Sequence, residues 1–288
     1  MIHSFWLDSN RNTGSIGNPD IAFPWWSFSK TLIAICTLKL VETGALKLDA
    51  CLPGRPYSIR QLLQHRAGVP DYGSLATYHE AVASDQNAWS REQLFQQVDP
   101  EHLLFQPGTG WAYSNIGYLL VREQLEQQSG LGLAALVDQF ISMPLGLTGV
   151  HLAVNRGEIA ERYDPGWVYH GCFVGPINAA VRMLAALRSG QLLDPESLAA
   201  MLDTYRLGGG LPGRPWVSHG YGLGLMAGNT HDCGFACGHS GAGPQSVSAV
   251  YSFEGVDNPV TVGAFTSASD EAVAENEAQR IALLCQHQ

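Results

Sequence analysis

The chain has 288 residues, of which 45% are apolar and 15% charged, a composition typical of a globular protein and not of a disordered one. Its formal net charge of −10 and its lack of a Lys/Arg cluster argue against nucleic acid or an anionic membrane as a partner. The sequence contains no run of about 18 apolar residues, the length that would predict a membrane span. The N-terminus lacks the basic start and apolar stretch of a signal peptide. We therefore expect a cytoplasmic location, or a periplasmic one if a leader has been removed.

Turn signals divide the first 26 residues, which are expected to hold one or two strands, near 2–7 and 21–26. A helix over 28–43 follows. It is apolar on nearly every side, as a central buried helix would be, and Gly44 ends it. A short helix is predicted to begin at Ser58, and residues 75–205 are predicted to be mostly helical. Helices in that stretch are expected from Ser90, over 114–128, 131–141 and 176–190, and from Pro195.

After about residue 216 the pattern changes to strands, predicted at 219–226, 246–253 and 259–265. Residues 256–259 are expected to connect the last two as a hairpin loop, and Ser269 is expected to cap a final helix. The predicted fold class is α+β. A mixed α/β lobe with an antiparallel sheet flanked by helices would come from about 1–70 and 206–288. An all-helical lobe would come from about 71–205.

The chain has six cysteines, and several lie in apolar or helical contexts. They are Cys36, Cys51, Cys172, Cys233, Cys237 and Cys285. The scatter favours free thiols in a reducing compartment over a disulfide framework.

Ser27 and Lys30 form the only Ser-x-x-Lys in the chain. Residues three apart on a helix lie on the same face, so the two side chains can meet. A serine hydroxyl needs a nearby base to act as a nucleophile, and a lysine kept neutral by burial can supply one. The start of a buried helix also favours the negative charge that develops when such a nucleophile attacks a carbonyl.

Two further segments carry chemistry. Tyr113 and Asn115 form the only Tyr-x-Asn, at the end of a Pro-Gly loop. A tyrosine beside a cationic lysine can have its phenol pKa lowered and serve as a base, and an asparagine can orient a substrate carbonyl or amide. The third segment, 238–244, is a glycine-rich strand edge that allows a substrate to approach closely and could offer a free amide to an oxyanion.

The order and spacing of these three motifs resemble the serine β-lactamase and penicillin-recognising superfamily. The resemblance covers roughly residues 19–285 and is closest to the class C branch, which includes β-lactamase-like esterases, D-alanyl-D-alanine carboxypeptidases and D-aminopeptidases. It implies a β-lactamase/transpeptidase-like fold, and a site that requires no metal or organic cofactor. Ser27 resembles the acylated nucleophile, Lys30 the lysine that shares its proton, and Tyr113 the general base. The residues that resemble substrate ligands are Asn115, His239, Ser240, Gly241 and Ala242.

The sequence departs from this family in two ways. Only 26 residues precede Ser27, so we expect one edge strand of the sheet to be missing or replaced. His239 also stands where the family has a lysine that often helps to hold a substrate carboxylate. A neutral histidine weakens that role, and histidine is common there among the esterase-like members. The resemblance therefore favours a carboxylesterase that acts on small esters through an acyl-enzyme at Ser27.

Several alternatives stay open. A β-lactamase, a D-Ala-D-Ala carboxypeptidase or a D-aminopeptidase would use the same residues, and a binding protein without catalysis could use the same fold. The partner is expected to be a small ester, amide or β-lactam, and the sequence leaves a homo-oligomer open. Two readings are disfavoured. Segment 238–242 ends in alanine where a nucleophile elbow needs glycine. The spacing of His231, Cys233, Cys237 and His239 fits no common zinc site.

Overall fold

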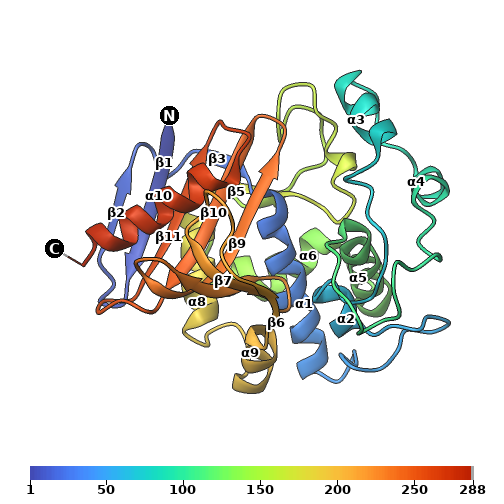
Figure 1. Ribbon diagram of the computed structural model, residues 1–288, viewed down its shortest axis with the longest axis horizontal. Helices are drawn as coiled ribbons and strands as arrows, with labels where there is room; N and C mark the ends of the chain where they lie inside the picture. The colour runs from blue at the N-terminus through green and yellow to red at the C-terminus, as the bar shows by residue number, and fades with distance from the viewer. Residues whose placement is uncertain (287–288) are drawn as a thin grey trace.

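The computed structural model describes residues 1–286. An eight-stranded antiparallel sheet forms one side of the molecule, in the order β2-β1-β11-β10-β9-β8-β7-β6 (Figure 1). Its strands come from the two ends of the chain: β1 (Ile2–Asp8), β2 (Thr13–Ile16), β6 (Tyr205–Gly208), β7 (Trp216–Tyr221), β8 (Met226–Thr230), β9 (Gly234–Gly243), β10 (Ser246–Phe253) and β11 (Val260–Thr266). The predicted α+β class with an antiparallel sheet is confirmed.

Helices cover the central strands of the sheet. Helix α8 (Ile177–Arg188) packs against β1, β10 and β11, and α10 (Glu271–Leu284) packs against β9, β10 and β11. Every residue of β11 is buried, because a strand with a helix on each face has no side open to water.

Helix α1 (Ser29–Glu42) lies between the sheet and the remaining helices (Figure 1). It contacts α5, α6 and α9, and eleven of its residues, Lys30 among them, are buried. The other helices are α2 (Ile59–Leu63), α3 (Ala76–Ala83), α4 (Arg91–Val98), α5 (Asn115–Ser129), α6 (Leu133–Val137), α7 (Met143–Leu145) and α9 (Pro195–Leu202). The predicted caps at Ser58 and Ser90 are confirmed, and each forms a capping box with a glutamine three residues on.

A small second sheet, β3 (Ala22–Pro24), β5 (Phe173–Pro176) and β4 (His151–Leu152), joins the start of the chain to its middle. Three short helical turns complete the fold: η1 (Trp26–Phe28), the π-type η2 (Asp138–Ser142) and η3 (Pro165–Trp167).

Three predictions about local structure are wrong. The N-terminal segment contributes both β1 and β2 to the large sheet, so no strand is missing before Ser27. The final helix is capped by the Asp270 carboxylate and not by Ser269. The strand predicted over 219–226 is interrupted: residues 219–221 end β7 and Met226 begins β8, but 222–225 form the hairpin turn between them. At Gly224 (φ +73°) the turn passes α1 so closely that a Cβ would lie 2.6 Å from the Cβ of Ala34.

The division into an α/β and a helical lobe stays a prediction, and α8, which that division assigned to the helical lobe, packs on the sheet. All six cysteines are free thiols, as expected, and only Cys51 is exposed. Within residues 1–286, no helix has the length and apolar character needed to cross a bilayer.

Candidate active site

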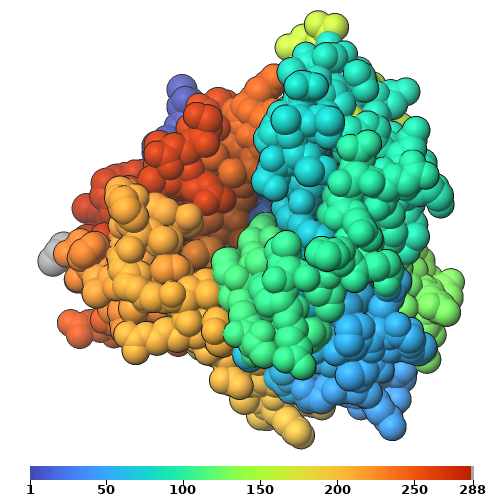
Figure 2. All heavy atoms as spheres, turned by 45° about the vertical axis from the view of Figure 1, so that its right-hand side comes forward, coloured from blue at the N-terminus to red at the C-terminus, as the bar shows by residue number. Residues whose placement is uncertain are grey.

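A cavity of about 700 Å³ opens between the sheet and the helices. Figure 2 shows the hollow between the segment near residues 70–115 and the C-terminal strands. Ser27 lies on its wall, in the single turn η1 that precedes α1. The residue before it, Trp26, has φ +44°, a left-handed conformation that is strained for a bulky side chain. The first hydrogen bond of the turn is the one that Phe28 N–H donates to Trp25 O. Ser27 comes one residue earlier, so its amide N–H takes no part in that bond.

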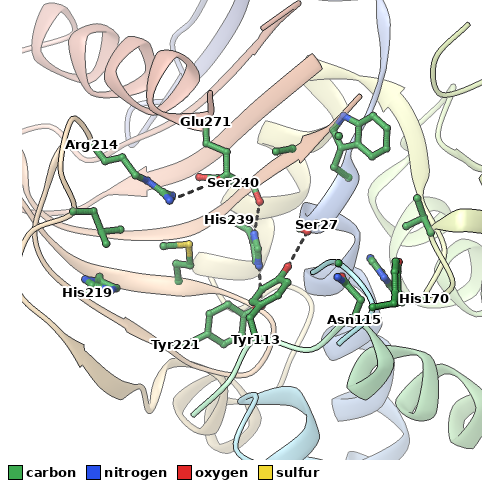
Figure 3. Close-up of a pocket in the computed structure, with 18 of the residues that line it drawn as sticks. Ser27, Tyr113, Asn115, His170, Arg214, His219, Tyr221, His239, Ser240 and Glu271 are labelled. Atoms are coloured by element: carbon green, nitrogen blue, oxygen red, sulfur yellow. Dashed lines mark hydrogen bonds and ion pairs between the residues drawn. The ribbon is translucent and has the colours of Figure 1, made fainter. Parts of the chain in front are cut away.

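Two side chains reach the Ser27 hydroxyl. Tyr113 OH donates to Ser27 Oγ over 2.8 Å (Figure 3). Lys30 Nζ lies 3.1 Å from the same oxygen. Lys30 is fully buried beneath Ser27 and comes from the first turn of α1. Tyr113 comes from the extended segment just before α5. The fold therefore brings together the first two predicted motifs, which lie 86 residues apart in sequence.

Burial sets the protonation of this trio. Loss of water around Nζ lowers the pKa of Lys30 to about 7, although the charge of Asp71 raises it in part. Burial raises the pKa of Tyr113 well above its usual range, and the bond to Ser27 offsets little of this. The prediction that a cationic lysine lowers the phenol pKa is therefore wrong, because Lys30 is itself close to neutral. At neutral pH the amine can accept a proton and the phenol holds one.

Strand β9 forms the opposite wall of the site. Strand β8 pairs with β9 only over Gly234–Gly238, so residues 239–243 have β10 on one side and η1 on the other. A Cβ at Gly241 would lie 2.8 Å from the backbone oxygen of Trp25, so glycine permits this close approach. Ala242 is exposed and lines the cavity.

Replacing Gly241 with alanine is expected to push β9 away from η1 and to lower the free energy of unfolding by about 1–3 kcal/mol, the usual cost of overpacking. Urea unfolding followed by circular dichroism measures this. Gly132→Ala is the matched control, because a Cβ there meets nothing within 4 Å. Equal unfolding midpoints for the two variants would contradict the close approach.

The two polar side chains of the third motif point in different directions. His239 Nδ1 lies next to the carbonyl oxygen of Ser240, and Tyr221 OH lies 2.8 Å from His239 Nε2. A carbonyl only accepts, so Nδ1 carries the proton and Tyr221 donates to Nε2. Burial lowers the pKa of His239 to about 3, so the ring is neutral. Ser240 Oγ instead bonds Tyr251 OH at 2.7 Å and the Glu275 carboxylate.

An ion-pair cluster closes the end of the cavity near α10 (Figure 3). Arg214 pairs through two nitrogens with the buried Glu275 and through its third with Glu271 at 3.1 Å. Arg214 and Glu271 both line the cavity. Two carboxylates against one guanidinium leave this end with a formal excess of one negative charge, while burial raises the pKa of Glu271.

Comparison with known proteins shows that residues 6–286 match the model of the Beta-lactamase family. This chain belongs to that family. Penicillin-binding protein 4* of Bacillus subtilis (strain 168) is 33% identical over 154 residues, and Esterase EstB of Burkholderia gladioli is 29% identical over 159 residues. These matches cover 50% and 48% of this chain but only 34% and 40% of the two relatives. A D-stereospecific amidohydrolase from Streptomyces sp. superposes with a TM-score of 0.79 over 99% of this chain and 93% of its own, at 22% identity, and so shares the fold.

Sequence reasoning about this Beta-lactamase family chain missed several residues of the site: Arg214, Tyr221 and Glu271 on the cavity wall, and two that contact the predicted catalytic motifs. Asp71 accepts from the backbone N–H of Asn115 at 2.7 Å and from its side-chain Nδ2 at 3.1 Å. His170 Nε2 lies 3.2 Å from Lys30 Nζ. Asp71 and His170 both lie within irregular loop or turn segments and belong to no spaced motif. The one signal for Asp71 is its place in a Pro-Asp-Tyr-Gly turn.

Proposed function

We propose that this protein is a serine hydrolase that forms an acyl-enzyme at Ser27 and acts on small uncharged carboxylic esters. The observation that carries the proposal is the Ser27 hydroxyl, held between a buried lysine of lowered pKa and a protonated tyrosine on the wall of a cavity. Acyl transfer requires a nucleophilic oxygen with a base and an acid within hydrogen-bond distance of it, and Ser27 Oγ has both.

In acylation, Lys30 takes the Ser27 proton as Oγ forms a bond to the ester carbonyl carbon. The backbone amides of Ser27 and Ala242 would hold the resulting oxyanion. Tyr113 then gives its proton to the leaving alkoxide as the ester C–O bond breaks, which leaves a phenolate beside the Lys30 ammonium. The Lys30 Nζ lies 5.0 Å from the Tyr113 ring centroid, so the two opposite charges stabilise each other.

In deacylation, water attacks the acyl carbon and gives its proton to the Tyr113 phenolate. The bond from the acyl carbon to Ser27 Oγ breaks, and the Lys30 ammonium returns its proton to that oxygen. A carboxylic acid leaves and both groups regain their starting states. Tyr113 thus acts as an acid in the first half and as a base in the second. The family resemblance implies the role of general base for Tyr113.

The charges in the cavity support an uncharged ester over a substrate with a carboxylate. Both ring nitrogens of the neutral His239 are engaged within the protein, and all three side-chain nitrogens of Arg214 are paired with carboxylates. Neither residue therefore offers a free positive charge to a substrate carboxylate, which a β-lactam or a peptide C-terminus would bring.

Hydrolysis of p-nitrophenyl butyrate, nitrocefin and D-alanine p-nitroanilide by the wild type and by Ser27→Ala tests the proposal. We expect the ester to be turned over at least about 100-fold faster than the β-lactam, a difference of roughly 3 kcal/mol, and no turnover by the variant. Faster hydrolysis of nitrocefin would move the assignment to a β-lactamase. No turnover of any substrate by the wild type would favour a binding protein.

A second candidate function is hydrolysis of esters or amides that carry an amino group. It rests on Glu271, which lines the cavity and contributes the excess negative charge beside Arg214. An ammonium group would be attracted to that end of the cavity, whereas a carboxylate would be repelled. Preferential turnover of D-alanine p-nitroanilide, reduced in Glu271→Gln, would favour this function.

The rate of ester hydrolysis is expected to rise with pH through about 7. Below the Lys30 pKa of about 7 the amine is an ammonium and has no lone pair for the Ser27 proton, and above it the amine is neutral. On this basis kcat/KM falls about tenfold per unit below pH 6 and levels off above pH 8. A pH profile of kcat/KM for p-nitrophenyl butyrate measures the midpoint. A rate that stays constant from pH 5 to 8 would contradict a lysine base.

A further inference from the structure

The Lys30 amine has three polar neighbours. Its Nζ lies 2.7 Å from Asn115 Oδ1, 3.1 Å from Ser27 Oγ and 3.2 Å from His170 Nε2. An ammonium would donate to all three. A neutral amine has only two N–H groups and one lone pair, so one of the three neighbours must then be the donor.

Hydrogen-bond accounting shows which neighbour donates. Asp71 accepts from Asn115 Nδ2, which turns the amide oxygen of Asn115 toward Lys30, and an amide oxygen can only accept. Ser27 Oγ accepts from Tyr113, and acylation requires the Ser27 hydrogen to point at the Nζ lone pair, so Ser27 is the donor in the reactive arrangement. In that arrangement the second N–H of neutral Lys30 goes to His170 Nε2, and the imidazole carries its hydrogen on Nδ1.

We propose that His170 is a positioning residue for Lys30: by accepting one N–H of the neutral amine, it directs the nitrogen lone pair at the Ser27 hydroxyl. The effect on catalysis rests on the proposed acyl-enzyme function, whereas the effect on Lys30 does not. His170 is not part of any of the three motifs, and it contributes to the site only through this contact and the cavity wall.

The surroundings of His170 fit this role. The side chain is buried, and no hydrogen-bond partner for Nδ1 lies among residues 1–286, so the ring is held at the site by its Nε2 contact. Burial lowers its pKa well below the usual value, and the positive charges of Lys30 and Arg122 act in the same direction. A neutral ring adds no charge beside Nζ, so it leaves the amine free to lose its proton.

The groups that face Lys30 from other elements are few. The charges of Asp71 and Glu271 raise its pKa, and the aromatic rings of Tyr113 and Tyr118 lie 5.0 and 5.5 Å from Nζ. Cys172 also lies nearby, but burial raises the pKa of its thiol to about 12, so it stays neutral. The buried His170 ring lies directly against the amine and excludes water from that side of it. Removing its imidazole would admit water, which solvates an ammonium better than a neutral amine.

Titration of the lysine side-chain nitrogens tests the proposal directly. The chain has only three lysines, Lys30, Lys39 and Lys47, so protein labelled with ¹⁵N-lysine gives three Nζ signals. In the wild type we expect Lys30 to titrate near 7. In His170→Ala we expect its midpoint to rise by about one unit or more, with a loss of about tenfold in kcat/KM at pH 7.

Two further variants separate positioning from general damage. His170→Gln places an amide oxygen near the position of Nε2, so it should restore most of the Lys30 midpoint and of kcat/KM. His151→Ala removes an exposed histidine on β4 and should change neither. Thermal unfolding of each variant establishes that the fold is intact.

The outcomes are distinct. An unchanged Lys30 midpoint in His170→Ala would overturn the proposal, and so would failure of His170→Gln to restore the midpoint in a folded protein. If the wild type hydrolysed no ester, the proposed function would fail. The shift of the Lys30 midpoint would still decide whether His170 holds the amine.

Discussion

Lys30→Met is expected to lower kcat/KM for p-nitrophenyl butyrate by about 10³–10⁴-fold, because it removes the base that takes the Ser27 proton. Methionine fills a similar volume and is apolar, so it suits the fully buried position of Lys30 in the first turn of α1. The variant should therefore stay folded while its chemistry is lost. Initial rates at pH 8, where the wild-type amine is neutral, give the cleanest comparison.

Lys39→Met is the matched control for this experiment. Lys39 lies on the same helix, pairs with Glu42 at 2.6 Å, and is partly exposed outside the site. Its replacement is expected to leave kcat/KM within about twofold of the wild type, because Lys39 does not line the cavity. The variant should also stay folded, because a partly exposed ion pair contributes less than about 1 kcal/mol to stability. Activity retained in a folded Lys30→Met protein would show that the base lies elsewhere.

Tyr113→Phe is expected to lower kcat/KM by about 10²–10³-fold, because the leaving alkoxide and the deacylating water lose their proton partner. The hydroxyl of Tyr113 bonds Ser27, and the ring packs against His65 and Tyr221, contacts that phenylalanine keeps. The fold should therefore remain. Because the loss concerns a proton, it should be smallest for esters with the most acidic leaving alcohol.

A series of p-nitrophenyl, phenyl and ethyl butyrate esters measures that dependence. Tyr205→Phe serves as the control, since Tyr205 packs on Arg66 outside the cavity and its loss of a hydroxyl should not change the rates. An equal loss in Tyr113→Phe for all three esters would rule out proton donation to the leaving group.

Much of the site follows from short-range patterns. Ser27 and Lys30 are three residues apart at the start of an apolar run, and helix geometry alone brings them together. The helix over 28–43 could be predicted because its residues are apolar around the whole circumference. The structure places it at Ser29–Glu42. The caps at Ser58 and Ser90 follow from local hydrogen bonding in the same way.

The parts of the site and fold that the sequence did not predict depend on packing between distant segments. Asp71 and His170 lie in irregular loops, so no periodicity marks them, and they meet Asn115 and Lys30 only because the sheet and helices enclose them. The phenol pKa of Tyr113 was predicted in the wrong direction because desolvation, which no motif records, outweighs a neighbouring amine. The 219–226 segment was predicted as one strand because its glycines were not recognised as a turn against α1.

Covalent labelling with a fluorophosphonate, read by intact mass and peptide mapping, tests the central claim most directly. The proposed mechanism predicts one adduct per chain, located on Ser27, and none in Ser27→Ala. An adduct of the same stoichiometry in Ser27→Ala, or one mapped to another residue of the wild type, would contradict Ser27 as the nucleophile.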